Sequence, residues 1–381
     1  MSSASAVLDR PTETPSQAEP ARDAWHDNAK FVLIVLVAVG HLLSKGVTER
    51  MGVAHALYVW IYLFHMPAFI FIAGHFSRRR SLTERSVQGI VMRAIVPFIV
   101  FTVLYATAAS LVTGNALRID LVNPYWLLWF LPALAAWKLI TPVYLNLRWP
   151  LTISLVVGLG VGLIERVGAD FSISRIFSLA PFFVLGAMIT PESLRRLTQP
   201  LARMAGAAVL LVSATLVFLF HDHIARPGYL FWNNGYDKQH LTALEGFASR
   251  GAMYVLGAVL LLALLAVMPT RRTWIAGLGA ASLYIYLLHG FLVRGASKFG
   301  LVDLVTDVPG LIAMLVVTTA VCIALGSPWV RKLARPVVEP KLKWLLRRDD
   351  DEDPAPSGAG RDRSWEDRGH GGRERASSGS R

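Results

Sequence analysis

Long apolar runs separated by short polar segments are the dominant pattern of this 381-residue chain. A helix of roughly 20 apolar residues is long enough to cross a bilayer. The pattern therefore predicts an all-α, polytopic integral membrane protein with about ten transmembrane helices. The predicted spans are 29–44, 55–76, 88–112, 125–146, 150–165, 172–190, 202–220, 250–268, 275–294 and 308–327.

Neither end of the chain continues this pattern. Residues 1–24 are polar and lack the basic-then-apolar layout of a cleavable signal peptide. The segment after Arg347 mixes both charge signs with Gly, Ser and Pro, a composition that cannot bury a core. We expect a disordered N-terminal tail at 1–24, a membrane domain at 25–330, and a basic flank with a disordered C-terminal tail at 331–381.

The basic residues gather in every second loop between the predicted spans. With the N-terminus in the cytosol, these are the inner loops, and the positive-inside rule favours that orientation. We therefore expect a multi-pass protein of the cell membrane with both termini in the cytosol. The inner-loop arginines are Arg78, Arg79, Arg80, Arg85, Arg93, Arg148, Arg195, Arg196, Arg203, Arg271 and Arg272.

Composition restricts the class of protein further. The chain is 54% hydrophobic and only 17% charged, which excludes an ordinary soluble domain. Its net charge of +12 could suggest nucleic acid, but the basic residues fall in short clusters between apolar segments. We therefore expect membrane lipid, and no nucleic acid, as a partner. The single cysteine, Cys322, lies inside a predicted span, so no intramolecular disulfide can form.

Lys30 and His41 lie at the two ends of the first span, in DNAKFVLIVLVAVGHLL. The helical segment between them advances by about 16 Å and about three full turns, so both side chains lie on nearly the same stripe. Ionisable groups inside a membrane are costly and each suggests a function. We interpret the pair as a path for an anionic substrate that leads to an imidazole base. The alternative for His41 is a structural hydrogen bond between helices.

Other polar groups extend this hypothesis. His289 lies about as deep in the ninth span as His41 does in the first, and Ser282 and Tyr286 share its face. His65 lies near the middle of the second span, where Pro67 follows and a structural role is the alternative. Near the inner surface, Arg78, Arg79 and Arg93 either set the topology or contact phosphate.

The sequence shows no metal-ligand cluster, so we expect no metal and no bound cofactor. His221 and His223 are the nearest approach to such a cluster, and two loop histidines alone are weak evidence. They begin the outer loop 221–249, whose polar and aromatic residues suit a glycan or another hydroxylated acceptor.

Several stretches, read in order, resemble the acyltransferase-three family of membrane O-acyltransferases, in particular its fucose 4-O-acetylase-like branch. They are DNAKFVLIVLVAVGHLL, IYLFHMPAFIFIAGHFSRR, RAIVPFIVF, YWLLWFLPALAAWKL, PFFVLGAMI and SLYIYLLHG, and the resemblance covers about residues 26–330. It implies about ten spans and transfer of an acyl group, usually acetyl, from cytosolic acyl-CoA to a hydroxyl of a sugar or glycan. His41 matches the family's histidine of the first span, and Lys30 stands where many members have arginine.

The resemblance implies roles for the candidate residues. Basic side chains at the cytosolic mouth, Lys30, Arg78, Arg79 and Arg93, would attract the phosphates of acyl-CoA. His41 would act as general base on the acceptor hydroxyl or carry the acyl group transiently. His289, Ser282 or Tyr286 would orient the acceptor or stabilise the oxyanion, and His65 would contribute to the substrate site.

A proton-coupled secondary transporter or flippase for an anionic or glycan substrate is the competing interpretation. His41, His65 and His289 would then form a proton relay, and the basic mouth would act as an anion gate. Dependence on acyl-CoA, as opposed to dependence on a proton gradient, separates the two.

Overall fold

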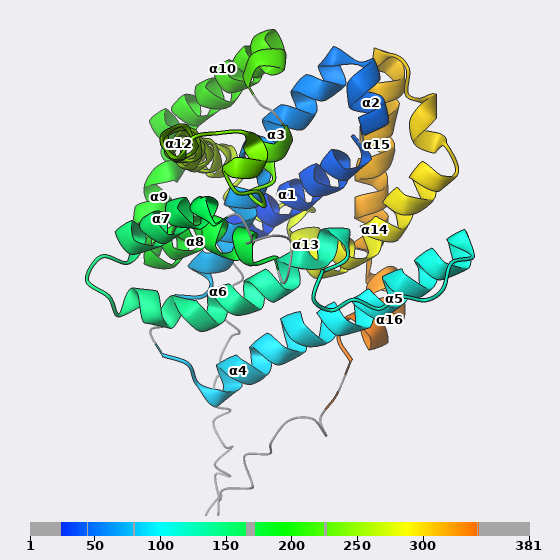
Figure 1. Cartoon of the computed structure of the whole chain (residues 1–381), viewed down its shortest axis with the longest axis horizontal. Coiled ribbons are helices and arrows are strands. Elements are labelled where there is room, and N and C mark those ends of the chain that lie inside the picture. Colours follow the sequence, from blue (N-terminus) through cyan, green and yellow to red (C-terminus); the bar gives the residue numbers. More distant parts are fainter. Residues whose placement is uncertain are drawn as a thin grey trace, which may run out of the picture. The chain divides into compact units, whose positions relative to one another are not determined.

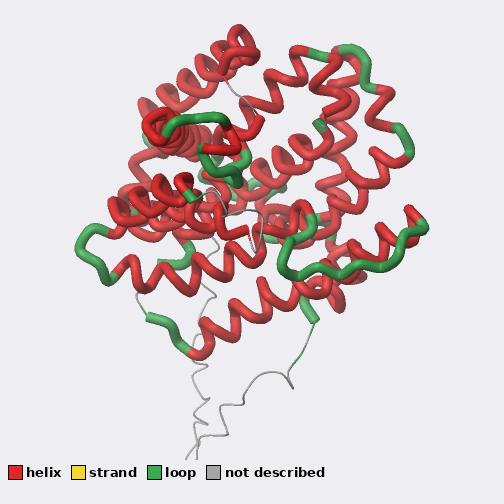
Figure 2. Tube along the Cα trace, in the orientation of Figure 1, coloured by secondary structure: helices red, strands yellow, loops and turns green. Residues whose placement is uncertain are grey.

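The computed structural model describes residues 24–43, 45–78, 81–164, 172–224, 227–340 and 342. Within these ranges all regular structure is helical and no strand occurs (Figure 2). The α-helices are α1 Ala24–Leu42, α2 Lys45–Arg50, α3 Gly52–His75, α4 Glu84–Ile90, α5 Val96–Thr113, α6 Phe130–Leu145, α7 Pro150–Gly160, α8 Ile173–Met188, α9 Pro191–Arg195, α10 Pro200–Ile224, α11 Pro227–Leu230, α12 Ala243–Val267, α13 Ala276–Gly279, α14 Ser282–Lys298, α15 Val308–Leu325 and α16 Pro328–Val338. Short π or 3-10 segments are η1 Val91–Ile95, η2 Trp126–Trp129, η3 Val161–Leu163, η5 Arg196–Thr198, η6 Asp237–Gln239 and η7 Leu301–Leu304.

A helix lies over each of the predicted spans, but fewer helices than ten are long and apolar enough to cross a membrane. Among the described residues six meet that standard, or seven if the bent pair Ile173–Met188 and Pro191–Thr198 is one span. The prediction of about ten transmembrane helices is therefore corrected to six or seven among the described residues. Helices α7, α8 and α14 contain 11, 16 and 17 residues, which is short for a crossing, and α1 begins with polar turns.

The polar start of α1 is buried in protein. The Trp25 indole donates to the carbonyl of Leu265 at 2.9 Å. The Asn28 side chain is fully buried and donates to the carbonyls of Pro269 and Arg271 at 2.9 and 3.0 Å. These bonds tie the first turns of α1 to the end of α12, so α1 begins at Ala24, earlier than the predicted start at 29.

Helix α1 lies at the centre of the helical unit (Figure 1). It packs against α3 on one side and against α13, α14 and α15 on the other. By contrast, the most apolar windows of α10 and α15 are only 11% and 17% buried in protein. Apolar helices with so little protein cover need lipid around them, which agrees with a membrane protein.

Two glycines bring α3 and α8 into direct backbone contact. A Cβ built on Gly74 would overlap the carbonyl oxygen of Phe183, and a Cβ built on Gly186 would overlap that of Phe71. Small residues at such crossings let two helix backbones approach closely. This contact fixes α3, which carries several residues of the cavity described below.

Apart from Ala24, which begins α1, the N-terminal tail predicted at 1–24 lies outside the described residues, and so does the tail predicted after Arg347. The basic flank begins as α16, a helix that crosses the boundary predicted at 330. Trp329 and Leu333 are each 83% exposed on α16, and Arg331 lies over the ring of Tyr284, 5.8 Å from its centroid.

Candidate functional site

His41 and His289 meet between α1 and α14. His41 Nδ1 lies 3.2 Å from His289 Nε2, and the two rings stack with an interplanar angle of 14°. His289 is 1% exposed, whereas His41 is half-buried. The structure therefore joins the two histidines that the sequence placed at similar depth on separate spans.

Hydrogen bonding assigns the protons of this pair. His289 Nδ1 lies 3.0 Å from the carbonyl oxygen of Ile285, and a carbonyl can only accept, so Nδ1 carries the proton. In neutral His289 the lone pair is then on Nε2, which must accept from His41 Nδ1–H. This pair of hydrogen bonds leaves His41 with an unprotonated Nε2, which is the form that a general base requires.

One wall of a cavity of about 960 Å³ is formed by His41. The cavity has aromatic walls from Tyr58, Tyr62, Trp126 and Phe231. Charged and titratable side chains line it as well, namely Glu49, Arg50, His55, His221, Asp222 and Arg294. Aromatic faces combined with a few polar groups are typical of a small-molecule site.

Trp126 connects His41 to this cavity. Its ring centroid lies 4.5 Å from that of His41, and the Arg294 guanidinium lies 4.9 Å from the indole centroid. The backbone of Trp126 has φ = 36°, in the left-handed region that a bulky residue rarely adopts. Strain of this kind is found at functional sites, where the surrounding packing imposes it.

A second, much smaller pocket reaches His41 from a different set of residues. It encloses about 30 Å³ and is lined by Ile34, Val37, His41, Met66, Phe69, Leu127, Trp129, Phe130 and Tyr286. His41 therefore borders both a wide polar cavity and a narrow apolar pocket. The Tyr286 hydroxyl, expected to face a substrate, donates instead to the carbonyl of Leu127.

Neither Ser282 nor His65 hydrogen-bonds to the histidine pair in the contacts that the structure describes. Ser282 is the first residue of α14 and lines neither pocket that His41 borders. His65 is buried, and its Nδ1 donates to the carbonyl of Ile61 at 2.8 Å on its own helix. The ring of His65 packs against Tyr62, which lines the large cavity, so His65 supports the wall of that cavity.

Lys30 pairs with an acid. Its Nζ lies 2.8 Å from Asp27 Oδ1 and 4.8 Å from the ring centroid of Phe76. The Asp27 carboxylate offsets part of the cationic charge expected at this end of α1. The Lys30 side chain is 24% exposed.

Phe76 also lines a basic pocket of about 470 Å³ between α4, η1 and α6. Arg85, Arg93 and Lys138 supply its positive charge, and Ser77, Ser81, Thr83 and Ser86 supply hydroxyls. The predicted residue Arg93 therefore lines a cationic pocket, and Phe76 is a neighbour of both this pocket and Lys30. Arg78 is exposed and does not line the pocket, and Arg79 lies outside the described residues.

Part of the loop 221–249 folds inward. Trp232 and Tyr236 are 4% and 3% exposed. The Tyr236 ring fills the space beside Gly162 and Gly246 and lies 4.7 Å from the buried guanidinium of Arg250. The loop therefore offers less surface to a glycan than its composition suggests. Its contribution to the cavity comes from His221, Asp222 and Phe231.

Several lining residues were missed from the sequence. Lys138 and Arg294 are single cations within apolar segments, and the rule that flagged the histidines could have found them. His55 and Trp126 carry no such signal, because an aromatic residue or a histidine near a span end is common at a membrane interface. Only the packing of α3 and η2 places these two beside the cavity.

Comparisons with known proteins agree with the sequence resemblance. Residues 23–327 match the family described as "Acyltransferase domain". The chain is 26% identical over 296 residues to Nodulation protein NolL of Sinorhizobium fredii, covering 72% of this chain and 78% of that protein. It is 30% identical over 122 residues to Nodulation protein NolL of Mesorhizobium japonicum, covering 28% and 33% of the two chains. No solved structure matches the chain.

Proposed function

The chain belongs to the acyltransferase-three family, and from this premise we propose that it is a membrane O-acyltransferase. It moves an acyl group, acetyl by the family resemblance, from acyl-CoA to a hydroxyl of a sugar, glycan or related acceptor. The observation that carries the proposal is the pairing of His289 with His41, which lies on the wall of the large cavity.

His41 acts as the general base in this proposal. Its unprotonated Nε2 takes the proton of the acceptor hydroxyl while that oxygen attacks the thioester carbonyl. The C–S bond breaks, and the proton moves from the imidazolium to the departing CoA thiolate. His289 Nε2 accepts from His41 Nδ1–H, which orients the ring and stabilises its cationic form. In the covalent variant of this mechanism, His41 Nε2 attacks the thioester carbonyl and the C–S bond breaks to release CoA thiolate. The acceptor hydroxyl then attacks the acyl group, its proton passes to the thiolate, and the bond to Nε2 breaks to restore neutral His41.

The donor binds at the basic pocket. Arg85, Arg93 and Lys138 offer charged donors to the phosphates of CoA, and the pocket hydroxyls add neutral ones. Lys30, which lies over the Phe76 ring, adds positive charge at this end of α1. The narrow pocket beside His41 has mostly apolar walls, and we place the acyl group of the donor there, away from bulk water. By the charge bias of the loops, this end of α1 faces the cytosol, and both termini lie on that side of the cell membrane.

Lys138→Ala and Arg93→Ala are each expected to raise KM for acetyl-CoA about tenfold with kcat little changed. A charge-assisted hydrogen bond contributes about 1.5–3 kcal/mol, and one that binds substrate and transition state equally acts on KM alone. The measurement is a donor titration in membranes with each variant. Arg148→Ala is the matched control, because Arg148 is an exposed inner-loop arginine outside the pocket. With acetyl-pantetheine, which lacks the nucleotide phosphates, the pocket variants should equal the intact chain, and a similar loss with both donors would contradict this assignment.

The acceptor binds in the large cavity. Tyr58, Tyr62, Trp126 and Phe231 offer faces for a sugar ring, and Arg294 offers hydrogen bonds to its hydroxyls. A cavity of about 960 Å³ has room for a sugar together with the linkage to a larger chain. The acceptor class is therefore a hydroxyl-bearing compound that enters from the end of α1 that carries His41.

Transfer of labelled acetyl from acetyl-CoA by membranes that contain the chain tests the proposed function. Glycan and lipid-linked fractions of the host are supplied as acceptors, and hydroxylamine release checks that the new bond is an ester. We expect label in a hydroxyl-bearing product, unchanged when an ionophore collapses the proton gradient. Labelled product that disappears with the gradient, or proton-coupled flux without acyl transfer, would support the transporter reading instead.

A further inference from the structure

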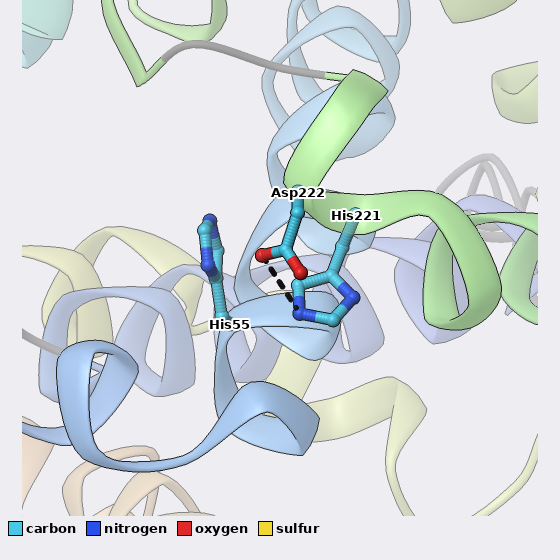
Figure 3. A group of neighbouring side chains, drawn as sticks. All are labelled: His55, His221 and Asp222. Atoms are coloured by element: carbon cyan, nitrogen blue, oxygen red, sulfur yellow. Dashed lines mark ion pairs between the residues drawn. The ribbon is translucent and has the colours of Figure 1, made fainter.

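Three potential metal ligands meet on the wall of the large cavity. His55 comes from the first turn of α3, and His221 and Asp222 come from the last turn of α10 (Figure 3). One ligand atom from each residue lies within 4.8 Å of the others. All three side chains also line the cavity that His41 borders. His223, which the sequence paired with His221, is not part of this group.

The local backbone of α10 creates this arrangement. At Phe220 the chain leaves helical values, with φ = −125° and ψ = 15°. The kink redirects the last turn, so that two consecutive residues, His221 and Asp222, face the start of α3 (Figure 3). The His55 and His221 rings lie 5.2 Å apart with an interplanar angle of 78°.

His221 has the orientation of a metal-bound histidine. Its Nδ1 lies 3.1 Å from the carbonyl oxygen of Phe218 and donates to it, which leaves Nε2 as the ring atom that a cation would bind in place of a proton. A ligating histidine commonly donates its other ring proton to a carbonyl, which fixes the tautomer. His221 Nε2 and Asp222 Oδ1 lie 3.3 Å apart, at ion-pair distance (Figure 3), and a cation bound to both atoms would take the place of the proton between them.

The spacing fits a small divalent cation. In a tetrahedral zinc site, bonds of 2.0–2.2 Å place neighbouring ligand atoms about 3.4 Å apart. The 3.3 Å pair of His221 and Asp222 meets that value, and a side-chain rotation of His55 closes the remaining gap. Gly52 leaves space here, because a Cβ at this position would lie 3.4 Å from His221 Nε2.

We propose that His55, His221 and Asp222 form a binding site for a divalent transition-metal cation of the zinc class. Two imidazoles and one carboxylate leave a fourth position open, which is the arrangement of zinc sites that also hold water or a substrate oxygen. The open position faces the cavity. The ion joins the first turn of α3 to the last turn of α10, and the site does not depend on the acyltransferase reaction.

The test is a zinc titration of the full chain, purified in detergent through a tag without histidines. Calorimetry gives the affinity and stoichiometry, and the visible spectrum of the Co²⁺ form reports the coordination number. We expect one tightly bound ion per chain and a thermal midpoint that rises with zinc concentration, because these three ligands come together only in the folded chain. His55→Ala, His221→Ala and Asp222→Asn should each weaken binding at least tenfold and remove the rise.

His223→Ala is the matched control, because His223 is an exposed histidine next to the site and outside the ligand group. It should bind zinc as the intact chain does. The acidic run 349–353 contributes the same weak background in every variant. Asp222→Asn changes no side-chain volume and keeps the test valid where a histidine variant unfolds. The proposal is overturned if the intact chain binds no zinc, if Asp222→Asn binds as tightly as it does, or if His223→Ala loses as much affinity as the ligand variants.

Discussion

Replacing His41 by alanine is expected to lower kcat/KM for acyl transfer by about 10²–10⁴-fold, the usual contribution of a general base. The reason is geometric. His41 borders both the wide polar cavity and the narrow apolar pocket, so it is the titratable side chain common to the two. The measurement is the initial rate of labelled acetyl transfer at several donor concentrations, with insertion of the variant checked in parallel.

His289→Gln tests whether His289 serves mainly to position His41 or is itself required for the reaction. Glutamine keeps a hydrogen-bond acceptor near His41 Nδ1 but loses the stacked ring and the bond to the Ile285 carbonyl. We expect a smaller loss, on the order of tenfold, that acts on kcat more than on KM. His65→Gln is the comparison, because His65 is also buried but bonds only within its own helix among the contacts described, and it should keep most of the activity. A folded, inserted His41→Ala protein with full activity would exclude the proposed mechanism.

The sequence located the histidine pair but could not establish the contact between the rings. Helical spacing predicts the depth of His41 and of His289 from each span separately, because rise per residue is constant. Whether the two spans are neighbours depends on packing, which periodicity within one helix does not encode. The same limit applies to Lys30, since its stripe on α1 was predictable but its partner Asp27 and the Phe76 ring were not considered.

Helix positions were predictable for a different reason. An apolar run that is long enough must form a helix in lipid, because its backbone groups have no other partners. The number of complete crossings was harder to predict, because a helix such as α7 can be apolar and still too short when the chain packs it against α8. Asn28 is a similar case, because its side chain is buried and bonds to loop carbonyls. A hydropathy pattern does not distinguish such a buried polar residue from one exposed to solvent.

Gly186→Ala is expected to destabilise the fold strongly for so small a substitution. The new Cβ would overlap the carbonyl oxygen of Phe71, a backbone atom that cannot rotate away, so α3 and α8 must separate. Overpacking of a tight core costs about 1–3 kcal/mol, and a backbone clash belongs at the upper end of that range. We expect the thermal midpoint in detergent to fall by about 5–10 °C, measured by loss of the monodisperse peak on heating.

Gly251→Ala is the matched control, because Gly251 lies inside α12 and a Cβ there meets nothing within 4 Å. It should be neutral or stabilising by about 0.5–1 kcal/mol, since alanine favours the helix. A midpoint for Gly186→Ala equal to that of Gly251→Ala would show that the two helices are not in backbone contact.

The double variant Gly74→Ala with Gly186→Ala adds a sharper test. Both glycines act at one crossing, so helices already separated by the first substitution should accept the second at lower cost. The loss of stability in the double variant should therefore be less than the sum of the losses in the two single variants. Both glycines also lie in stretches that carry the family resemblance, IYLFHMPAFIFIAGHFSRR and PFFVLGAMI. The close approach of the α3 and α8 backbones at these glycines is a physical reason for small residues there, and α3 carries Tyr58, Tyr62 and His55 into the cavity. Loss of this contact should therefore lower acyl transfer as well as stability.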